Sequence, residues 1–411
     1  MHRILYISYD GMTDPLGQSQ VIPYLIGLSK AGYEFHILSA EKPDAYARHQ
    51  TEIATLLAEH NIHWHPIEYT KKPPLISTMR DIHTMKHLAN DLHQRYHFSM
   101  THCRSYISAF VGMMLKKSHL VPFLFDMRGF YPDERVDGGL WKQSNPVFKA
   151  VYRYFKRKER HFFNGCDHLI SLTENGKETI NALNFKNLET DDITVIPCCA
   201  DLEHFNPEQV NNSQISTYRK NLNFRENDFV LTYLGSIGTW YMPEEMLDFF
   251  AELLKSKPQS KFLIITKDDT VSMQALAEKK QIPSGKIVFI SASRAEVPIL
   301  LKLTSVSLFF IKPVFSKKAS SPTKLAELLA MGVPVVCNGN VGDIDRIVEK
   351  HKAGLVLHDF RSETYRDIIN QFPELLQSNP NHLRQVANDL FSLTEGVDRY
   401  QKVYQKLTHS K

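Results

Sequence analysis

The sequence predicts an α/β protein made of two tandem doubly wound (Rossmann-like) domains. Short apolar segments alternate with longer amphipathic segments along almost the whole chain, which is typical of βαβ units around parallel sheets. With 411 residues, of which 43% are hydrophobic, the chain is long enough to build two or three domains with substantial cores. The alternation lapses once, near the middle, and this lapse predicts the boundary between the two domains.

The first domain is predicted over residues 1–200. Its strands are expected at seven apolar runs, namely 3–8, 34–39, 62–67, 100–103, 123–127, 168–172 and 194–197. Its helices are expected at six amphipathic segments, namely 21–31, 45–60, 76–96, 107–116, 147–162 and 174–183. This alternation describes one complete doubly wound sheet.

A polar stretch, 201–227, follows and is predicted to be a linker region. A second alternation over 228–391 predicts another doubly wound domain. Its strands are expected at 229–234, 261–266, 287–290, 306–311 and 355–357, and its helices at 243–255, 270–280 and 297–302. Two such domains leave one natural place for a ligand, a cleft between them at the carboxyl ends of the strands.

The most informative segment, 320–336, lies in the second domain. It predicts a polar loop, a helix that opens near Pro322, and a buried strand after a glycine stop. The free N–H groups of such a helix start attract phosphate, and Lys324 adds a positive charge beside them. Glu327, one turn later, is placed to accept hydrogen bonds from a sugar diol. These features favour a nucleotide-sugar site, although a well-capped helix before a core strand has the same pattern.

The same segment resembles the donor-binding motif of family 4 glycosyltransferases, which are retaining enzymes of the GT-B fold. In that family two glutamates, eight positions apart, precede an Ala-x-Gly-x-Pro-Val run. Glu327 matches the second glutamate and 330–335 matches the run, whereas Ala319 stands where the first glutamate is usual. The donor-binding residues implied by this resemblance are Thr323, Lys324, Leu325 and Glu327, with Glu327 on the ribose diol.

The loop after the first strand, 10–20, is long and polar and leads into a helix. Gly17 permits close approach to the backbone, so this loop is a candidate contact for the donor's phosphates or sugar. An ordinary βα loop with a turn glycine has the same appearance. The stretch 9–30 is similar to a bacterial cell-surface polysaccharide branch of the family. The family's architecture also implies that a helix within 392–411 returns to the first domain, which is the acceptor side.

Four carboxylates and two arginines follow the fifth predicted strand, within 125–139. Catalytic groups in α/β folds often stand at such strand ends. In related enzymes the residue at this place, often a histidine, approaches the transferred sugar, and here Asp126 or Arg128 occupies it. Asp126 is a candidate acceptor for a sugar hydroxyl or the acceptor's proton, and Arg128 a candidate contact for the leaving diphosphate. A self-neutralising ion-pair network is the alternative.

Departure of a diphosphate requires positive charge, which the family supplies with an arginine after the first strand of the second domain. Ser236 stands at that place here. Other cations must then substitute, and Lys324 is favoured because it lies inside the motif. The candidates are Lys267, Arg294, Lys317, Lys318 and Lys324, each of which is otherwise a solvated surface charge.

The sequence predicts neither a catalytic metal nor a cofactor. Asp343 and Asp345 spell Asp-x-Asp but lie at a predicted helix start, where capping explains them. His63 and His65 alternate on one predicted strand, and no metal-binding spacing is supported by further ligands. The formal net charge of +4 is too weak to indicate nucleic-acid binding. Five cysteines without metal-ligand spacing favour a reducing cytoplasm.

The segment 141–163 carries seven basic residues against one acid, with apolar residues at helical spacing. A basic amphipathic helix of this kind either docks on anionic lipid or packs on a core with its basic face in water. Both interpretations stay open. Peripheral contact with the inner face of the cytoplasmic membrane would suit a lipid-linked acceptor.

Together with these features, the resemblance to family 4 implies a metal-independent, hexosyltransferase-type glycosyltransferase of retaining mechanism. Its donor would be a nucleoside-diphosphate sugar and its acceptor a hydroxyl of a lipid-linked or polysaccharide glycan. Two alternatives remain. One is a nucleotide-sugar 2-epimerase of the same fold, and the other is a non-catalytic nucleotide-sugar-binding partner, which Ala319 and Ser236 favour.

Overall fold

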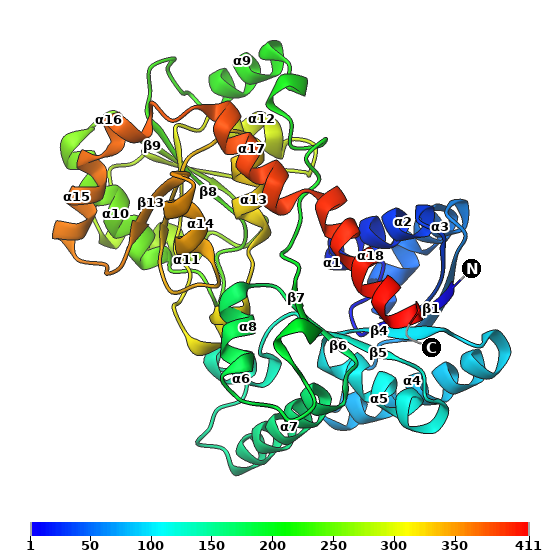
Figure 1. Cartoon of the computed structure of the whole chain (residues 1–411). Helices are drawn as coiled ribbons and strands as arrows, with labels where there is room; N and C mark the ends of the chain where they lie inside the picture. The colour runs from blue at the N-terminus through cyan, green and yellow to red at the C-terminus, as the bar shows by residue number, and fades with distance from the viewer. Residues whose placement is uncertain (1, 410–411) are drawn as a thin grey trace. The chain divides into compact units, whose positions relative to one another are not determined.

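The computed structural model describes residues 2–409, which divide into two compact units. Unit 1 runs to Pro197 and also takes in the C-terminal segment from Leu393, whereas unit 2 is Cys198–Ser392. Each unit is built on one parallel β-sheet with helices on both of its faces (Figure 1). The predicted fold class, α/β with two doubly wound domains, is therefore confirmed.

The sheet of unit 1 has seven strands in the order β3-β2-β1-β4-β5-β6-β7. Because successive strands are added on one side up to β3 and on the other from β4, the switch point lies between β1 and β4. In register, Ser8 is beside Arg104 and Arg104 is beside Asp126, so these residues form a row at the carboxyl ends of three strands. The strands are β1 (His2–Ser8), β2 (Tyr33–Glu41), β3 (Ile62–Glu68), β4 (Met100–Arg104), β5 (Phe123–Asp126), β6 (His168–Ser171) and β7 (Ile193–Val195).

Unit 1 contains two short helices where the sequence predicts loops, α1 and α6. Each has a proline in its first turn, and α6 also has Asp133 and Glu134 there, where the helix dipole favours acidic side chains. These local signals favour helices, although the polar composition of both segments predicts loops. The helices are α1 (Pro15–Gln20), α2 (Ile22–Lys30), α3 (Pro43–Glu59), α4 (Ile76–Tyr96), α5 (Ser105–His119), α6 (Tyr131–Asp137), α7 (Pro146–Gly165), α8 (Glu174–Asn181) and α18 (Leu393–His409).

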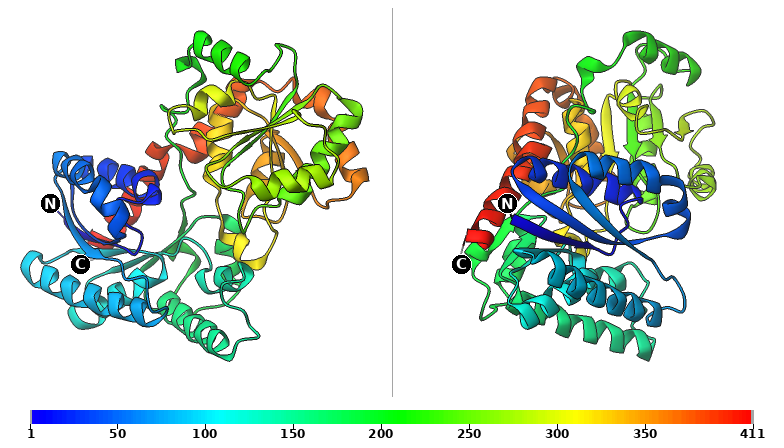
Figure 2. Two further views of the ribbon diagram at one scale, coloured as in Figure 1. Left: turned by 180° about the vertical axis from the view of Figure 1, so that it is seen from behind. Right: turned by 90° about the vertical axis from the view of Figure 1, so that its right-hand side faces the viewer.

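The C-terminal helix α18 packs against α2 within unit 1, and both views in Figure 2 show it beside the N-terminal helices. Gly27 makes this approach possible, because a Cβ atom there would lie 2.5 Å from Cγ2 of Val397. The rings of Tyr24 and Tyr400 meet edge to face with centroids 5.7 Å apart. A C-terminal helix thus completes the core of the N-terminal unit.

The sheet of unit 2 has six parallel strands in the order β10-β9-β8-β11-β12-β13, with its switch point between β8 and β11. The predicted linker region, 201–227, falls inside this unit and contains a helix, α9 (Asn212–Asn221). The side chain of Asn211 caps α9 by accepting a hydrogen bond from the amide of Ser213, a start signal hidden in a polar stretch. The strands are β8 (Val230–Leu234), β9 (Lys261–Ile265), β10 (Ile287–Ile290), β11 (Val306–Phe309), β12 (Val335–Asn338) and β13 (Gly354–Leu357).

The other helices of unit 2 follow its strands in the βα alternation that the sequence predicts, except that the last three follow one another after β13. Among residues 2–409, no helix combines the length and the apolar character needed to cross a membrane. The helices are α10 (Pro243–Ser256), α11 (Val271–Lys279), α12 (Val297–Leu301), α13 (Thr323–Ala330), α14 (Ile344–Lys350), α15 (Ser362–Asn370), α16 (Phe372–Leu375) and α17 (Pro380–Phe391).

We expect Gly27→Ala to destabilise the protein because its new methyl group collides with Val397. Overpacking of this kind costs about 1–3 kcal/mol, against a gain of up to about 1 kcal/mol from replacing a helical glycine. In a Val397→Ala background the collision is absent, so the same substitution should become neutral or stabilising. A double-mutant cycle in equilibrium urea unfolding measures the coupling. If Gly27→Ala changed the free energy of unfolding equally in both backgrounds, Gly27 and Val397 would not be in contact.

Candidate functional site

In unit 2 the switch point is occupied by a buried lysine among aromatic rings. Lys324, in the first turn of α13, is only 5% exposed. Its Nζ lies 3.7 Å from the ring centroid of Tyr241 and 4.4 Å from that of Tyr233, and donates a hydrogen bond of 3.2 Å to the Tyr233 hydroxyl. Gly235, with φ of +128°, leaves the space for this amine, because a Cβ there would lie 2.8 Å from Nζ. We call Lys324, Tyr233 and Tyr241 the lysine cage.

Burial lowers the proton affinity of the lysine in this cage. Burial lowers the pKa of Lys324 to about 7, opposed by the nearby carboxyl of Glu327. The π faces of the two tyrosines also favour the cation. Burial in turn raises the pKa of Glu327, opposed by Arg294 and Lys324. An anion that reaches this amine would stabilise its protonated form, so the cage is suited to gain positive charge when an anionic ligand binds.

The start of α13 lies beside the cage. Pro322 is its N-cap and contributes no side-chain hydrogen bond, while Thr323 and Lys324 follow in the first turn. Glu327 is partly exposed one turn later, whereas Leu325 is 2% exposed and packs in the core. Of the four motif residues predicted to bind a donor, Leu325 can therefore offer only backbone atoms. Ala319, where the family has its first glutamate, is fully buried.

The other cations predicted for this site differ in their surroundings. Lys317 is 7% exposed and its Nζ lies 3.7 Å from the ring centroid of Trp240, the residue before the Tyr241 of the cage. Arg294 is half-exposed, with its guanidinium 3.4 Å from the Asp201 carboxylate. Lys267 and Lys318 are exposed at the surface. The structure thus associates two lysines with two consecutive aromatic residues.

In unit 1 the row at the carboxyl ends of the strands is a charge cluster. Asp126 is 1% exposed, accepts a hydrogen bond of 3.0 Å from the Tyr400 hydroxyl, and lies 3.7 Å from Nη1 of Arg128. Arg104 lies between Asp126, at 4.0 Å, and Asp10, at 3.5 Å. Arg128 has φ of +58°, in the left-handed region that non-glycine residues seldom adopt. The cluster therefore presents two arginines that a buried carboxylate holds in place.

Asp126 is fixed as an anion. Burial alone would raise the pKa of Asp126, but Arg128, His102 and Arg104 hold it at about 2. Nε2 of His102 lies 3.5 Å from the carboxylate, and its Nδ1 lies 2.7 Å from the Tyr404 hydroxyl. Tyr400 and Tyr404 both belong to α18, so the C-terminal helix is bonded directly to this cluster. A carboxyl group with so low a pKa is a poor proton acceptor at neutral pH.

Glu41, at the carboxyl end of β2, organises the first βα loop. Its carboxylate accepts hydrogen bonds from the amides of Met12 (2.7 Å) and Thr13 (3.1 Å) and from the hydroxyl groups of Thr13 (2.5 Å) and Ser39 (2.6 Å). Gly17 is needed for packing of the loop on itself, because a Cβ there would lie 2.2 Å from the carbonyl oxygen of Gly11. The predicted contact of Gly17 with a donor stays a prediction.

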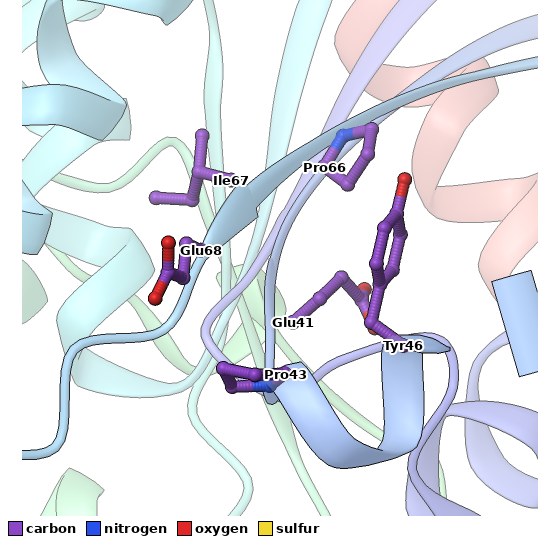
Figure 3. Close-up of a pocket in the computed structure, with 6 residues that line it drawn as sticks. All are labelled: Glu41, Pro43, Tyr46, Pro66, Ile67 and Glu68. Atoms are coloured by element: carbon purple, nitrogen blue, oxygen red, sulfur yellow. The ribbon is translucent and has the colours of Figure 1, made fainter. Parts of the chain in front are cut away.

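A pocket of about 350 Å³ opens beside this loop. Helix α3 contributes Pro43 and Tyr46, and β3 contributes Pro66, Ile67 and Glu68, whose side chains Figure 3 shows around the opening together with Glu41. The lining combines a tyrosine ring and apolar side chains with carboxylates. The tyrosine ring of such a lining can stack against a sugar ring, and its carboxylates can accept hydrogen bonds from the sugar's hydroxyl groups.

Several residues of these sites escaped the sequence analysis. The aromatic pair Trp240-Tyr241 was visible only as a short run after β8, and nothing in its spacing indicates that lysines rest on it. Arg104 ends a strand without any motif around it, and Tyr400 lies 274 positions from the Asp126 to which it donates. Such contacts between distant positions are set by the fold rather than by local spacing.

Two family models match the chain, and together they span most of its length. The model for "Glycosyltransferase Family 4" matches residues 21–204, and the model for "Glycosyl transferases group 1" matches residues 214–387. The chain belongs to the family 4 glycosyltransferases. Their GT-B architecture agrees with the two parallel sheets and with a candidate site at the switch point of each.

Solved structures share the fold of this glycosyltransferase along its whole length. A glycosyltransferase from Rickettsia africae is 14% identical, with a TM-score of 0.72 and coverage of 100% of this chain and 99% of that one. Anabaena HepE in complex with UDP-glucose is 14% identical, with a TM-score of 0.69 and coverage of 99% and 100%. WaaG, a glycosyltransferase involved in lipopolysaccharide biosynthesis, is 14% identical, with a TM-score of 0.67 and coverage of 98% and 99%. No curated protein sequence matches the chain.

We expect Lys324→Met to stabilise the glycosyltransferase near neutral pH. Because the pKa of Lys324 falls from 10.5 to about 7 on folding, the unfolded chain binds an extra proton between these values, and this contribution to stability rises with pH. The buried amine lowers the free energy of unfolding by its full amount below about pH 7, and it has no such effect above about pH 10.5. The variant should be more stable by about 1–3 kcal/mol at pH 6.5, with the difference shrinking towards pH 10.

Urea unfolding at several pH values measures this difference. Lys302→Met, at an exposed lysine of the same unit, is the matched control and should show no comparable pH dependence. A stability difference between wild type and Lys324→Met that is constant from pH 6.5 to pH 10 would contradict the assignment of a low pKa to Lys324.

Proposed function

We propose that this glycosyltransferase moves a hexosyl group, with retention of configuration, from a nucleoside-diphosphate sugar to a hydroxyl of a lipid-linked or polysaccharide acceptor. The observation that carries this proposal is the lysine cage beside the start of α13 at the switch point of unit 2. Ligands of open α/β sheets bind at such points, and helix starts bind phosphate. The glycosyltransferase family adds the expectation that the bound phosphate is that of a donor.

The lysine cage suits the departure of the diphosphate. As the bond between the sugar C1 and the phosphate oxygen breaks, negative charge grows on that oxygen, and Lys324 in its protonated form stabilises it with the amides of α13. The acceptor oxygen bonds to C1, and its proton passes to the departing phosphate. No covalent enzyme intermediate and no metal ion are required in this scheme. Glu327 accepts hydrogen bonds from the ribose hydroxyls.

For unit 1 we propose that Arg128 and Arg104 bind anionic or hydroxyl groups of the substrates. Asp126 then acts by positioning both arginines, because its burial and its pKa of about 2 make it a poor base. The pocket beside Glu41 is our candidate for the acceptor glycan, since it offers the ring of Tyr46 and the carboxylate of Glu68. Both assignments concern unit 1 alone and do not involve the lysine cage.

UDP is the first donor fragment to test, because HepE, which shares the fold, was crystallised with UDP-glucose. We expect Glu327→Ala to weaken UDP binding in calorimetry by about 10- to 100-fold, the loss of one or two charge-assisted hydrogen bonds. Glu327→Gln keeps one acceptor oxygen, so its affinity for UDP should lie between those of the wild type and Glu327→Ala. Glu278→Ala, at an exposed glutamate of unit 2, is the control. Unchanged UDP affinity in Glu327→Ala would refute the ribose assignment.

Turnover separates transfer from the two alternatives. Incubation with a panel of nucleotide sugars, with and without lipid-linked acceptors, should release free nucleotide only when an acceptor is present. Conversion of a donor to its 2-epimer without acceptor would instead identify an epimerase. Binding without either product would identify a non-catalytic partner.

We further propose that α7 contacts the inner face of the cytoplasmic membrane. Phe155 and Phe162 pack in the core, whereas Val147 and Tyr154 are 57% and 48% exposed. Exposed cations accompany them at Lys142, Lys149, Arg153, Arg157 and Arg160. Apolar side chains among cations are typical of helices that lie on anionic lipid.

Reversal of charge on α7 should weaken binding to phosphatidylglycerol vesicles. Each basic side chain near such a surface contributes about 1 kcal/mol, so Lys149→Glu with Arg153→Glu should lower the partition coefficient more than tenfold in vesicle sedimentation. Lys279→Glu with Lys302→Glu, on unit 2, makes the same change in net charge and should have little effect. Equal losses in both double variants would mean that net charge alone governs binding.

A further inference from the structure

Three side chains of the types that bind metal ions lie close together on β2 and β3 of unit 1. These two strands lie on the side of β1 that faces away from β4. Glu34 and His36 are two positions apart on β2 and share one face of the sheet, and His63 on β3 is in register with His36. Oε1 of Glu34 lies 3.4 Å from Nε2 of His36 and 3.9 Å from Nε2 of His63. Among residues 2–409 these form one group of three whose ligand atoms all lie within 4.8 Å of each other.

We propose that Glu34, His36 and His63 bind a divalent cation of the zinc class. Four ligand atoms at about 2.0–2.1 Å around a tetrahedral Zn²⁺ are about 3.3–3.4 Å apart. The separations of 3.4 and 3.9 Å between the Glu34 oxygen and the two imidazole nitrogens need only small adjustments, and the two nitrogens, within 4.8 Å of each other, must also approach. Two imidazole nitrogens and one carboxylate suit Zn²⁺ better than Mg²⁺ or Ca²⁺, which prefer oxygen ligands. Water completes the coordination from the side of His63, whose side chain is 48% exposed.

The neighbours of the group support this assignment. Nδ1 of His36 lies 2.9 Å from Nε2 of His65, a contact that fixes the orientation of the buried His36 ring. When Nδ1 carries the proton, the lone pair of Nε2 faces the Glu34 carboxylate, an arrangement of two acceptors that a cation between them would stabilise. Arg3, whose Nε lies 3.2 Å from both Glu34 oxygens, orients the carboxylate and also competes for it.

The position of the group limits its role. Glu34 and His36 lie near the beginning of β2, whereas the functional candidates of unit 1 lie at carboxyl ends of strands. A cation here would join β2 to β3 and stabilise that side of the sheet. It would not contact the transferred sugar, so the proposal is compatible with a transfer that needs no metal.

The test uses full-length protein without an affinity tag, in a His83→Gln/His87→Gln background. That background removes an exposed histidine pair on α4, with ring centroids 4.3 Å apart, which could bind metal on its own. Co²⁺ should produce the visible absorption of a four-coordinate nitrogen and oxygen site, and one equivalent of Zn²⁺ should displace it. Zn²⁺ should also raise the melting temperature.

His63→Gln and Glu34→Gln should each abolish the Co²⁺ spectrum and the Zn²⁺-dependent rise in melting temperature. Both side chains reach the surface, so the variants are expected to fold, and circular dichroism checks this. His49→Gln, which alters an exposed histidine on α3, is the matched control and should behave like the background protein. Absence of the spectrum in the background, or its persistence in His63→Gln, would overturn the proposal and leave a proton-sharing histidine cluster.

Discussion

The placement of a cationic side chain in an apolar setting governs the chemistry of unit 2. Water stabilises an ammonium group far better than a protein interior does, so Lys324 keeps its charge only if the surroundings supply a substitute. Two tyrosine faces and one hydroxyl supply part of it. The fold provides this environment because Lys324 lies at the switch point between β8 and β11, where Gly235 leaves room for the amine.

Unit 1 buries an anion instead, the carboxylate of Asp126, and surrounds it with groups that stabilise its charge. Asp126 has two arginines, a histidine and a tyrosine hydroxyl within about 4 Å. The tyrosine comes from α18, so the chain must pass through unit 2 and return before the cluster is complete. The C-terminal helix therefore contributes to a charge cluster whose central carboxylate lies some 270 positions earlier in the chain. Held in this way, Asp126 can keep Arg104 and Arg128 in fixed positions.

The sequence predicted what depends on local pattern. Each apolar run predicted to be a strand overlaps one in the structure, and the helix predicted to open near Pro322 is α13. It could not predict what depends on register between strands or on contacts between distant segments. The spacing around His63 reveals no further ligands because Glu34 and His36 lie on a neighbouring strand, and nothing near Tyr241 in the sequence indicates its contact with Lys324, which lies 83 positions away.

The two departures from the family motif, Ala319 and Ser236, have opposite electrostatic effects. Ala319 removes a negative charge relative to the family motif and Ser236 removes a positive one, so the formal net charge is preserved. The favoured candidate cation of this chain, Lys324, is buried among aromatic rings. In the proposed transfer, a lysine that the bound diphosphate already keeps protonated interacts more strongly as further negative charge develops on the leaving oxygen. Stabilisation that grows along the reaction lowers the barrier, whereas uniform binding does not.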